Sequence, residues 1–363
     1  MKKRTSLGAL RDKLYVKALF YPRVYRIRKS TKQRLRNIGG GAVLSYAEKR
    51  EINLFWEKYG VKVKPYWYKL FFVRAEHRIP TYIPDDLYYS KILPKLNNIL
   101  HRRAYTDKCF SDRIFPSVKR PKTIIKNSHG IYYDGSGNII DLKQAIEILQ
   151  RADSFLIKPA LDTGSGRLIN ICEAESPETV SSIVKQYKNN FIAQEIQSQH
   201  ADLALIHAQS LNTIRVISLL FKEEVHILSS VLRMGSGGAR LDNISAGGYA
   251  CPVNLSDGKL FKEAVNRKSE WVTRHDSGTV FGEFTVPSFA KIIAKVKELH
   301  QGLPHFSLIG WDFAVDQEGD PVFIEFNVSP EPNQISCGPT FGDLTEEVLT
   351  EIFIKKSYDE VNE

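Results

Sequence analysis

Cysteine is scarce in this sequence, with four residues among 363, and no two of them lie within metal-ligand spacing of each other. This scarcity excludes a zinc ribbon and a fold stapled by disulfides, and it fits a reducing compartment. We expect the four thiols to be small side chains of a core rather than reactive groups. They are Cys109, Cys172, Cys251 and Cys337.

Long hydrophobic runs are also lacking. No uninterrupted apolar stretch approaches the roughly 18 residues that a membrane-spanning helix needs, and Arg11, Asp12, Lys13 and Lys17 interrupt any signal-peptide core near the N-terminus. No segment is repeated or low in complexity. The composition, 42% hydrophobic and 25% charged over 363 residues, is typical of a globular protein with two or three packed units. We therefore expect a cytoplasmic protein.

Acidic residues are almost missing from the first 36 positions. Asp12 is the one acid there against 13 lysines and arginines, so the segment carries +12, while the whole chain carries +10 and the remainder only −2. Such a basic arm can bind an anionic membrane surface, a nucleic acid or an acidic polymer. Binding to a membrane would make the protein peripheral at the inner face of that membrane. We expect no nucleic acid, because no nucleic-acid-binding module accompanies the arm. The alternative is a solvated helix whose apolar side chains pack on the body, namely Leu10, Leu14, Val16, Leu19 and Phe20.

The predicted secondary structure changes near residue 106. Residues 1–105 predict mainly helix and loop, and from there on strands alternate with helices. We expect an α+β fold whose second half is an antiparallel sheet flanked by helices. The predicted strands are 154–159, 168–172, 190–196, 212–221 and 225–234, and the predicted helices are 45–59, 177–187 (capped by Ser176), 202–209, 287–300 and 345–356.

A hairpin near the C-terminus brings two acids together. Two apolar strands flank the loop 317–320, and counting back from it pairs Val315 with Val322. The same register places Asp312 opposite Glu325. Directly opposed carboxylates repel each other unless a cation lies between them.

The chemistry of this hairpin points to a metal ion. Strand alternation puts Glu325 and Asn327 on one face, with Ile324 and Phe326 on the other. Two carboxylates and an amide oxygen on rigid strands are what Mg²⁺ uses beside substrate phosphates, so Asp312, Glu325 and Asn327 are the predicted metal ligands. The alternative is a surface hairpin with solvated acids, which the apolar flanks disfavour.

A lysine at the end of an apolar strand marks a second region. Lys158 ends the strand FLIKP, where burial of its charge is costly unless an anion meets it. The loop that follows is rich in small residues, so its backbone N–H groups can approach phosphate oxygens. Its pattern is not that of a P-loop, and a glycine-serine hairpin alone is more often a simple turn. The loop residues are Thr163, Gly164, Ser165 and Gly166.

Two further segments carry candidate binding groups. One is the strand that ends at Gln194, Glu195 and Ile196, whose backbone can form hydrogen bonds with an adenine ring. His200 or Asp202, just beyond it, can bind the ribose hydroxyls. The alternative is a strand that simply ends at a helix cap.

Arginines on neighbouring strands form the other segment. Arg215 and Arg233 suit a phosphoryl or acyl-phosphate group, because the planar guanidinium bonds two oxygens at once. Asp242 and Asn243 follow downstream. The alternative for either arginine is a structural ion pair.

Together these segments resemble the ATP-grasp superfamily, and more narrowly its sugar-transfer-associated branch, found with cell-surface polysaccharide biosynthesis. The resemblance runs from about Ile83 onward, whereas residues 1–80 show little that matches. The segments that carry it include TDKCFSDRIFP, FLIKPALDTGSGRLINI, AQEIQSQ, SLNTIRVISLL, SVLRMGSGGARLDNISAGGYACPV, LIGWDFAV and FIEFNVSPEP.

The resemblance implies a role for each matched residue. Lys108 and Lys158 are implied nucleotide lysines, Gln194 to Ile196 the adenine hinge, and the loop at 163–166 a flap over the phosphates. Arg233 and Asn243 fall where phosphate and intermediate contacts are expected. Some ligases of the superfamily carry an arginine two residues before the metal aspartate, but Gly310 stands there. Arg233 or Arg215 must then stabilise any oxyanion.

The resemblance implies an ATP-grasp fold with ATP and Mg²⁺ as cofactors. We expect a basic arm and helical acceptor-side region at 1–105, a small ATP-grasp subdomain at 106–192 and a large one at 193–363. The expected reaction is ADP-forming ligation of a small-molecule carboxylate to an amine, on sugar-derived substrates.

Two alternatives remain open. One is a kinase acting on a sugar hydroxyl, with His275 and Asp276 as the candidate base, although a polar turn would also explain that pair. The other is a non-catalytic protein that binds a polyanion or membrane surface.

Overall fold

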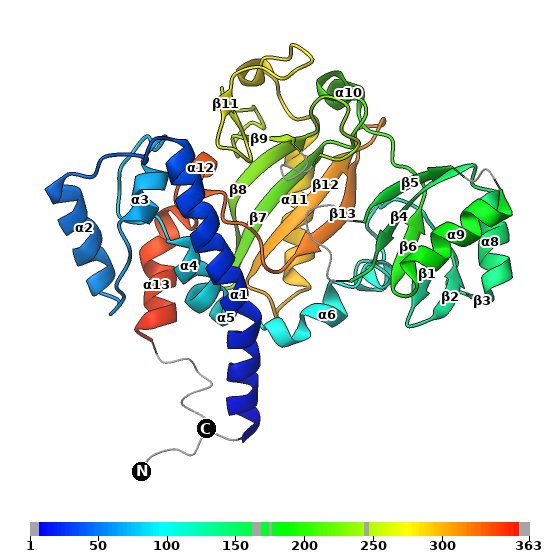
Figure 1. Cartoon of the computed structure of the whole chain (residues 1–363), viewed down its shortest axis with the longest axis horizontal. Coiled ribbons are helices and arrows are strands. Elements are labelled where there is room, and N and C mark those ends of the chain that lie inside the picture. The colour runs from blue at the N-terminus through cyan, green and yellow to red at the C-terminus, as the bar shows by residue number, and fades with distance from the viewer. Residues whose placement is uncertain (1–6, 162–167, 174–175, 243–246, 356–363) are drawn as a thin grey trace.

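The computed structural model describes residues 7–161, 168–173, 176–242 and 247–355. A seven-stranded sheet occupies the middle of the molecule (Figure 1). Helices of the N-terminal region and the last helix lie on one side of it, and a six-stranded sheet with two helices lies on the other. No described helix combines the length and the apolar character needed to cross a membrane.

The longest helix is α1 (Leu7–Asn37). Its buried residues Phe20, Val24, Thr31 and Leu35 are spaced by four, seven and four, so they form one face. This face packs against α3, α4 and the π-helical turn η1. The prediction that an N-terminal helix packs on the body is confirmed for Phe20, whereas Leu14 is exposed.

The rest of the N-terminal region consists of short helices around aromatic side chains, as predicted for a mainly helical segment. α2 begins with a capping box, in which Ser45 and Glu48 each bond the other's backbone N–H. Trp56, Trp67 and Tyr68 are fully buried. The elements are α2 (Tyr46–Glu57), α3 (Tyr66–Phe71), α4 (Asp85–Leu87), η1 (Tyr88–Ile92), α5 (Leu93–Leu96), η2 (Ile99–His101), α6 (Arg102–Tyr105) and α7 (Ser111–Ile114).

The smaller sheet has the strand order β3-β2-β1-β6-β4-β5, with antiparallel neighbours throughout. Two helices, α8 and α9, cover one face, and their apolar residues join those of the strands in a core of its own. Its elements are β1 (Thr123–Ser128), β2 (Ile131–Asp134), β3 (Ile139–Ile140), α8 (Leu142–Gln150), β4 (Ser154–Pro159), β5 (Asn170–Glu173), α9 (Pro177–Tyr187) and β6 (Phe191–Gln194).

The larger sheet has the order β11-β10-β9-β8-β7-β12-β13, again antiparallel throughout. α11 packs on one face of its central strands. The strands are β7 (Thr213–Phe221), β8 (Glu224–Met234), β9 (Tyr249–Pro252), β10 (Ala264–Asn266), β11 (Trp271–Val272), β12 (Leu308–Val315) and β13 (Pro321–Asn327), and the helices around them are α10 (Ala201–Ile206), η4 (Phe281–Glu283), α11 (Phe289–Gln301), α12 (Gln334–Cys337), η5 (Gly342–Leu344) and α13 (Thr345–Phe353).

The helical region and the larger sheet share a single hydrophobic core. Phe20 of α1, Trp56 of α2 and Trp311 of β12 all belong to it, although they are far apart in sequence. The smaller sheet keeps a separate core. The N-terminal helices are therefore part of the body that carries the larger sheet.

Most predicted elements are present, with ends that differ from the predicted ones by up to three residues. The strand 154–159 and the helix 177–187 capped by Ser176 have the predicted bounds. The sequence interpretation missed β1, β2, β3 and α8, which complete the smaller sheet. Cys109, Cys172 and Cys251 are buried, as expected of core thiols, and Cys337 is partly buried.

One register prediction for the β12–β13 hairpin was wrong. Val315 pairs with Pro321, not with Val322. A bulge beyond Asp312 inserts one extra residue into β13, so Asp312 still pairs with Glu325 as predicted. Because of the bulge, Phe323 packs near Phe326, whereas Ile324, expected on that face, is only partly buried.

Candidate functional site

The site begins with a row of charged side chains across the larger sheet. Arg215 of β7 pairs with Asp312 of β12, and Asp312 pairs with Glu325 of β13. Directly opposed residues project from the same face of a sheet, so the three side chains lie on one side. Trp311, next to Asp312 in sequence, points to the other side and packs near His300 of α11. The row therefore lies on the sheet face away from α11.

Asp312 is buried and paired with two arginines. Arg215 bonds both of its oxygens, through Nε to Oδ1 and through Nη2 to Oδ2 at 2.7 Å, and Arg233 Nη2 lies 3.0 Å from Oδ2. Burial alone would raise the pKa of Asp312, but the guanidinium groups hold it below its ordinary value. Burial also opposes the charge of Arg215, yet Asp312 raises the pKa of that guanidinium above the usual value. Both arginines retain N–H donors for a further anion.

Arg233 is fixed from its other side by Thr213, a residue that sequence reasoning missed. Thr213 Oγ1 accepts from Arg233 Nε at 3.0 Å and from Nη2 at 2.7 Å, and its hydroxyl donates to Asp242. Burial raises the pKa of Asp242 despite the nearby Arg233. Thr213 pairs with Arg233 in the β7–β8 register, so a correct register would have found it.

Two lysines from the smaller-sheet side face Glu325. Lys108 Nζ lies 3.2 Å from Glu325 Oε2, and the Lys108 backbone N–H donates to Ala160 O at 3.1 Å, two residues beyond Lys158. Burial lowers the pKa of Lys158 to about 8, and Glu325 partly opposes this. Burial would raise the pKa of Glu325, but Lys108 and Lys158 hold it below its ordinary value. Among described residues no hydrogen bond or ion pair reaches the Lys158 ammonium, which leaves it available to an anion.

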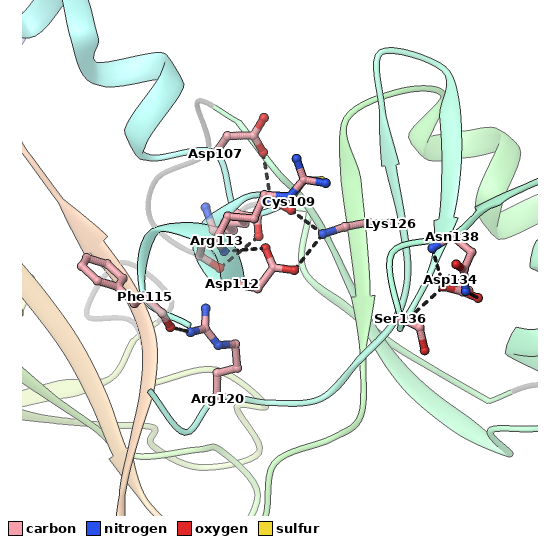
Figure 2. Close-up of polar contacts among 12 residues, drawn as sticks. Asp107, Cys109, Asp112, Arg113, Phe115, Arg120, Lys126, Asp134, Ser136 and Asn138 are labelled. Carbon is pink, nitrogen blue, oxygen red and sulfur yellow. Dashed lines mark hydrogen bonds and ion pairs between the residues drawn. The ribbon is translucent and has the colours of Figure 1, made fainter. Parts of the chain in front are cut away.

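The turn that carries Lys108 is held by a third lysine. Lys126 of β1, only 5% exposed, donates to Cys109 O at 2.8 Å and to Asp112 Oδ2 at 2.9 Å (Figure 2). Asp107 Oδ1 accepts from Cys109 N at 2.9 Å. Sequence reasoning missed Lys126, although a lysine inside the apolar stretch TIIKNS is the same signal that marked Lys158.

The helical region holds the loop that follows Asn327. Asn327 Oδ1 accepts from Ser329 N at 2.8 Å, and Arg23 of α1 donates to Ser329 O at 3.2 Å. Pro330 O accepts from the Tyr88 hydroxyl at 3.0 Å. Further bonds join Tyr89 to Pro330 and Ile83 to Gln334. The third predicted metal ligand is thereby tied to α1 and η1.

Gly310 is required by close packing. A Cβ there would lie 2.9 Å from Pro330 Cβ, 3.2 Å from Ile217 Cδ1 and 3.4 Å from Arg215 Cδ. No larger side chain fits without movement of its neighbours, and Arg215 already lies over this position. This packing explains why the arginine expected by resemblance is absent here.

The predicted adenine hinge lies where the chain passes from the smaller sheet to the larger one. Gln194 ends β6 and is buried, and Glu195 N donates to Lys122 O at 2.9 Å. Ile196 is 43% exposed. Asp202 is exposed in the first turn of α10, and no described contact joins it to the charged row. The hinge and the row are therefore separate parts of the described structure.

Five residues with predicted roles fall outside the described part of the chain. They are Thr163, Gly164, Ser165 and Gly166 of the flap, and Asn243. Their predicted roles stay predictions.

His275 and Asp276, the candidate base of a kinase, hold a glycine loop after β8. His275 Nε2 lies 2.8 Å from Gly235 O. Asp276 Oδ2 accepts from Ser236 Oγ at 2.6 Å and from Gly237 N at 3.1 Å, and these bonds hold the pKa of Asp276 below its ordinary value. Both side chains are thus engaged in shaping the loop.

The charges of the site favour a polyanion. Asp312, Glu325 and Asn327 offer the hard oxygen atoms that suit Mg²⁺, but both acids are already paired with cations. Within the described residues, no group of three or more histidine, cysteine, aspartate or glutamate side chains could hold a metal ion. The donor set fits a metal ion that shares its coordination with phosphates. The members of the site are the cations Arg215, Arg233, Lys108 and Lys158 and the anions Asp242, Asp312 and Glu325.

Comparison with known proteins identifies the family. The model of the sugar-transfer associated ATP-grasp family matches residues 90–344, well over half of the chain. No curated protein matches.

Similar solved structures include ATP-grasp ligases. The ATP-grasp ligase PsnB, complexed with minimal precursor, Mg and ADP, is 10% identical, with a TM-score of 0.39 over 69% of this chain and 59% of that one. D-alanyl-alanine synthetase A from Vibrio cholerae is 14% identical, with a TM-score of 0.40 over 69% and 66%. D-alanine–D-alanine ligase from Bacillus anthracis, complexed with ATP, is 12% identical, with a TM-score of 0.39 over 74% and 67%. This chain thus spans less than two thirds of the length of the first two, and the family assignment rests on the family model.

Proposed function

Because this chain belongs to the sugar-transfer associated ATP-grasp family, we propose that it is an ADP-forming ligase that uses ATP and Mg²⁺ to join a carboxylate to an amine. The carboxylate becomes an acyl phosphate, and the amine then displaces phosphate to give an amide. Sugar-derived substrates, such as a uronic acid with an amino acid or amino sugar, follow from the family's association with sugar transfer.

One observation carries the proposal. Lys108 and Lys158 approach Glu325 from the side of the smaller sheet, while Arg215 and Arg233 fix Asp312 on the larger one. Cations therefore converge on a pair of acids at the meeting of the two sheets. This arrangement suits a triphosphate that binds with its metal ion between the subdomains of residues 106–192 and 193–363.

The chain's own residues supply positioning and charge. Lys108 and Lys158 bind nucleotide phosphates, under the flap at residues 163–166. Arg233 and Arg215 offer their remaining N–H groups to oxygens that gain charge as phosphate is transferred. The role proposed for Asn243, a contact to phosphate or intermediate, rests on the family resemblance alone. Asp312, Glu325 and Asn327 would hold Mg²⁺, which would supply positive charge to neutralise the phosphates.

Bond changes in the proposed reaction need no protein nucleophile. A carboxylate oxygen forms a bond to the γ-phosphorus, and the bond from that phosphorus to the β-phosphate oxygen breaks, releasing ADP. The amine nitrogen then bonds to the acyl carbon, inorganic phosphate leaves, and the amine gives up a proton to solvent. A kinase would instead need a base at the acceptor, and the candidates His275 and Asp276 are bonded to the glycine loop.

Phosphorus NMR of ATP turnover tests the proposal directly. The protein is incubated with ATP, Mg²⁺, a pool of uronic acids and a pool of amines, and each pool is omitted in turn. We expect ADP and inorganic phosphate in amounts that depend on both pools. With hydroxylamine in place of the amines, the acyl phosphate should be trapped as a hydroxamate. ADP with a new phosphate ester would replace the ligase by a kinase, and unchanged ATP across all pools would count against this substrate class.

A further inference from the structure

The outward side of α1 carries a continuous exposed stripe. Residues three or four apart on a helix share a face, and seven exposed residues follow this spacing away from the buried face of α1. The first four are apolar or aromatic and the last three are basic. We call them the outer stripe: Leu14, Ala18, Tyr21, Tyr25, Lys29, Lys32 and Arg36.

The apolar half of the outer stripe is strongly exposed. Tyr21 is 78% exposed, Tyr25 66% and Leu14 57%. The N-terminal end of α1 projects beyond the rest of the molecule (Figure 1), whereas Tyr21 and Tyr25 directly follow the buried residues Phe20 and Val24 in sequence. Tyrosine combines an apolar ring with a polar hydroxyl, and this is why it concentrates where lipid headgroups meet acyl chains.

The basic half of the outer stripe differs from the inward arginines of the same helix in its contacts with the described residues. Arg28 pairs with Asp86 at 2.7 Å, and Arg23 lies 3.8 Å above the Tyr89 ring. Lys29 and Lys32, in contrast, form no ion pair with any acid in the part of the chain that the structure describes. Their charge adds to a segment that carries +12 over residues 1–36.

We propose that the outer stripe docks the protein on an anionic phospholipid surface, with its tyrosines at headgroup depth and its basic side chains against lipid phosphates. A duplex nucleic acid would use the basic half but would leave the apolar half without a role. Lipid accounts for both halves, since interfacial helices combine an inserted apolar part with charges that attract anionic headgroups. The proposal does not depend on the ligase reaction.

Vesicle co-sedimentation of the full chain tests the docking. Vesicles of phosphatidylcholine alone are compared with vesicles that contain one quarter phosphatidylglycerol. We expect binding to the anionic vesicles that weakens when salt rises from 0.1 to 0.5 M, because exposed charges are then screened within about 5 Å. Each basic side chain near such a surface contributes about fivefold to binding, so Lys29→Glu/Lys32→Glu should weaken partitioning at least about 25-fold. Tyr21→Ser/Tyr25→Ser should weaken it at unchanged charge.

A matched control separates the stripe from net charge. Lys49→Glu/Lys62→Glu makes the same charge change at two exposed sites outside α1 and should bind nearly as the parent does. Thermal melting should show that all variants are folded, since every substituted side chain is exposed.

Four results would overturn the proposal. The parent protein does not bind anionic vesicles, or the control variant loses as much vesicle binding as the stripe variants do. Alternatively, the parent binds a 20-base-pair duplex DNA more tightly than vesicles, or light scattering shows a concentration-dependent dimer that the tyrosine substitutions dissociate.

Discussion

At the scale of single residues, two of the three proposed metal ligands are acids whose negative charge is already balanced by neighbouring cations. Asp312 is bonded by Arg215 and Arg233, and Glu325 by Lys108. We therefore expect Mn²⁺, a paramagnetic substitute for Mg²⁺, to bind weakly alone and at least about tenfold more tightly with ADP, whose phosphates supply ligands and take over the lysines. Electron paramagnetic resonance of free Mn²⁺, titrated with protein in the presence and absence of ADP, measures both affinities.

Glu325→Gln removes a proposed metal ligand while keeping the size of the side chain. We expect this variant to lose the ADP-dependent Mn²⁺ binding and, with it, ATP turnover by about 10²–10³-fold. Glu318→Gln, at an exposed position in the turn of the same hairpin, is the control and should behave as the parent. Tight Mn²⁺ binding without nucleotide, or full activity of Glu325→Gln, would refute the assignment.

Lys158 gives the site a pH dependence. Burial lowers its pKa to about 8, with Glu325 and Asp312 opposing the shift and Lys108 adding to it. Below that pH the Lys158 ammonium is charged and can bind phosphate. Above it the side chain is neutral and must take up a proton before it can bind phosphate. Affinity for ADP should therefore fall by up to about tenfold per pH unit above about 8, which calorimetric titration from pH 7 to 9.5 would reveal.

The variant Lys158→Met should bind ADP more weakly at pH 7 and lose most of that slope. Lys122→Met changes a lysine that is 77% exposed and paired with Glu195, so it should keep the slope. An unchanged slope in Lys158→Met would assign the titration to another group.

At the scale of elements, a buried histidine links α11 to two strands of the larger sheet. His300 Nε2 lies 2.9 Å from Phe306 O, and Nδ1 lies 2.7 Å from Ser218 Oγ. Ser218 Oγ in turn accepts from Trp311 Nε1 at 2.8 Å. Burial lowers the pKa of His300 to about 4. The unfolded chain takes up this proton near pH 6.5 and the folded one only near 4, so the unfolding free energy should fall on acidification through that window, by up to about 3 kcal/mol.

Urea unfolding at several pH values between 4 and 7 measures this loss. His300→Gln, which keeps a donor and an acceptor, should be less stable at pH 7 by about 1–3 kcal/mol but show a shallower decline below pH 6.5. Parallel declines in the two proteins would mean that other groups titrate.

The same scale shows what the sequence could predict. Lys158, Asp312 and Glu325 were found because each breaks an apolar strand pattern at a point where burial of charge demands a partner. The predicted pairing of Val315 with Val322 was wrong, because a bulge has no sequence signal of its own here. Lys126 was missed because its strand, β1, was not identified. Local pattern thus revealed the charged residues, while their mutual support depends on register and on contacts between distant segments.

At the scale of the whole molecule, α1 contacts both the solvent and the loop that follows the candidate site on the larger sheet. Its outer stripe faces away from the body, whereas Arg23 on the inward side bonds the loop that carries Ser329, two residues beyond Asn327. The sequence could show a basic helix with apolar positions but not which positions pack, since these depend on α3, α4 and η1. A helix with two such faces cannot be removed to test one of them.

Deletion of residues 1–36 should therefore damage the fold and not merely detach the protein from a surface. Phe20 and Val24 are buried in the core shared with the larger sheet, and Leu35 is buried as well. Burial of each contributes about 1.5–3 kcal/mol. Their joint loss, about 5 kcal/mol or more, is comparable with the total stability of a typical domain. We expect the deletion to abolish the cooperative thermal transition or the soluble yield, whereas Lys29→Glu/Lys32→Glu keeps the parent's melting temperature within about 2 °C. A deleted protein that melts like the parent would show that α1 contributes little to the core, and the arm could then be assigned to surface attachment alone.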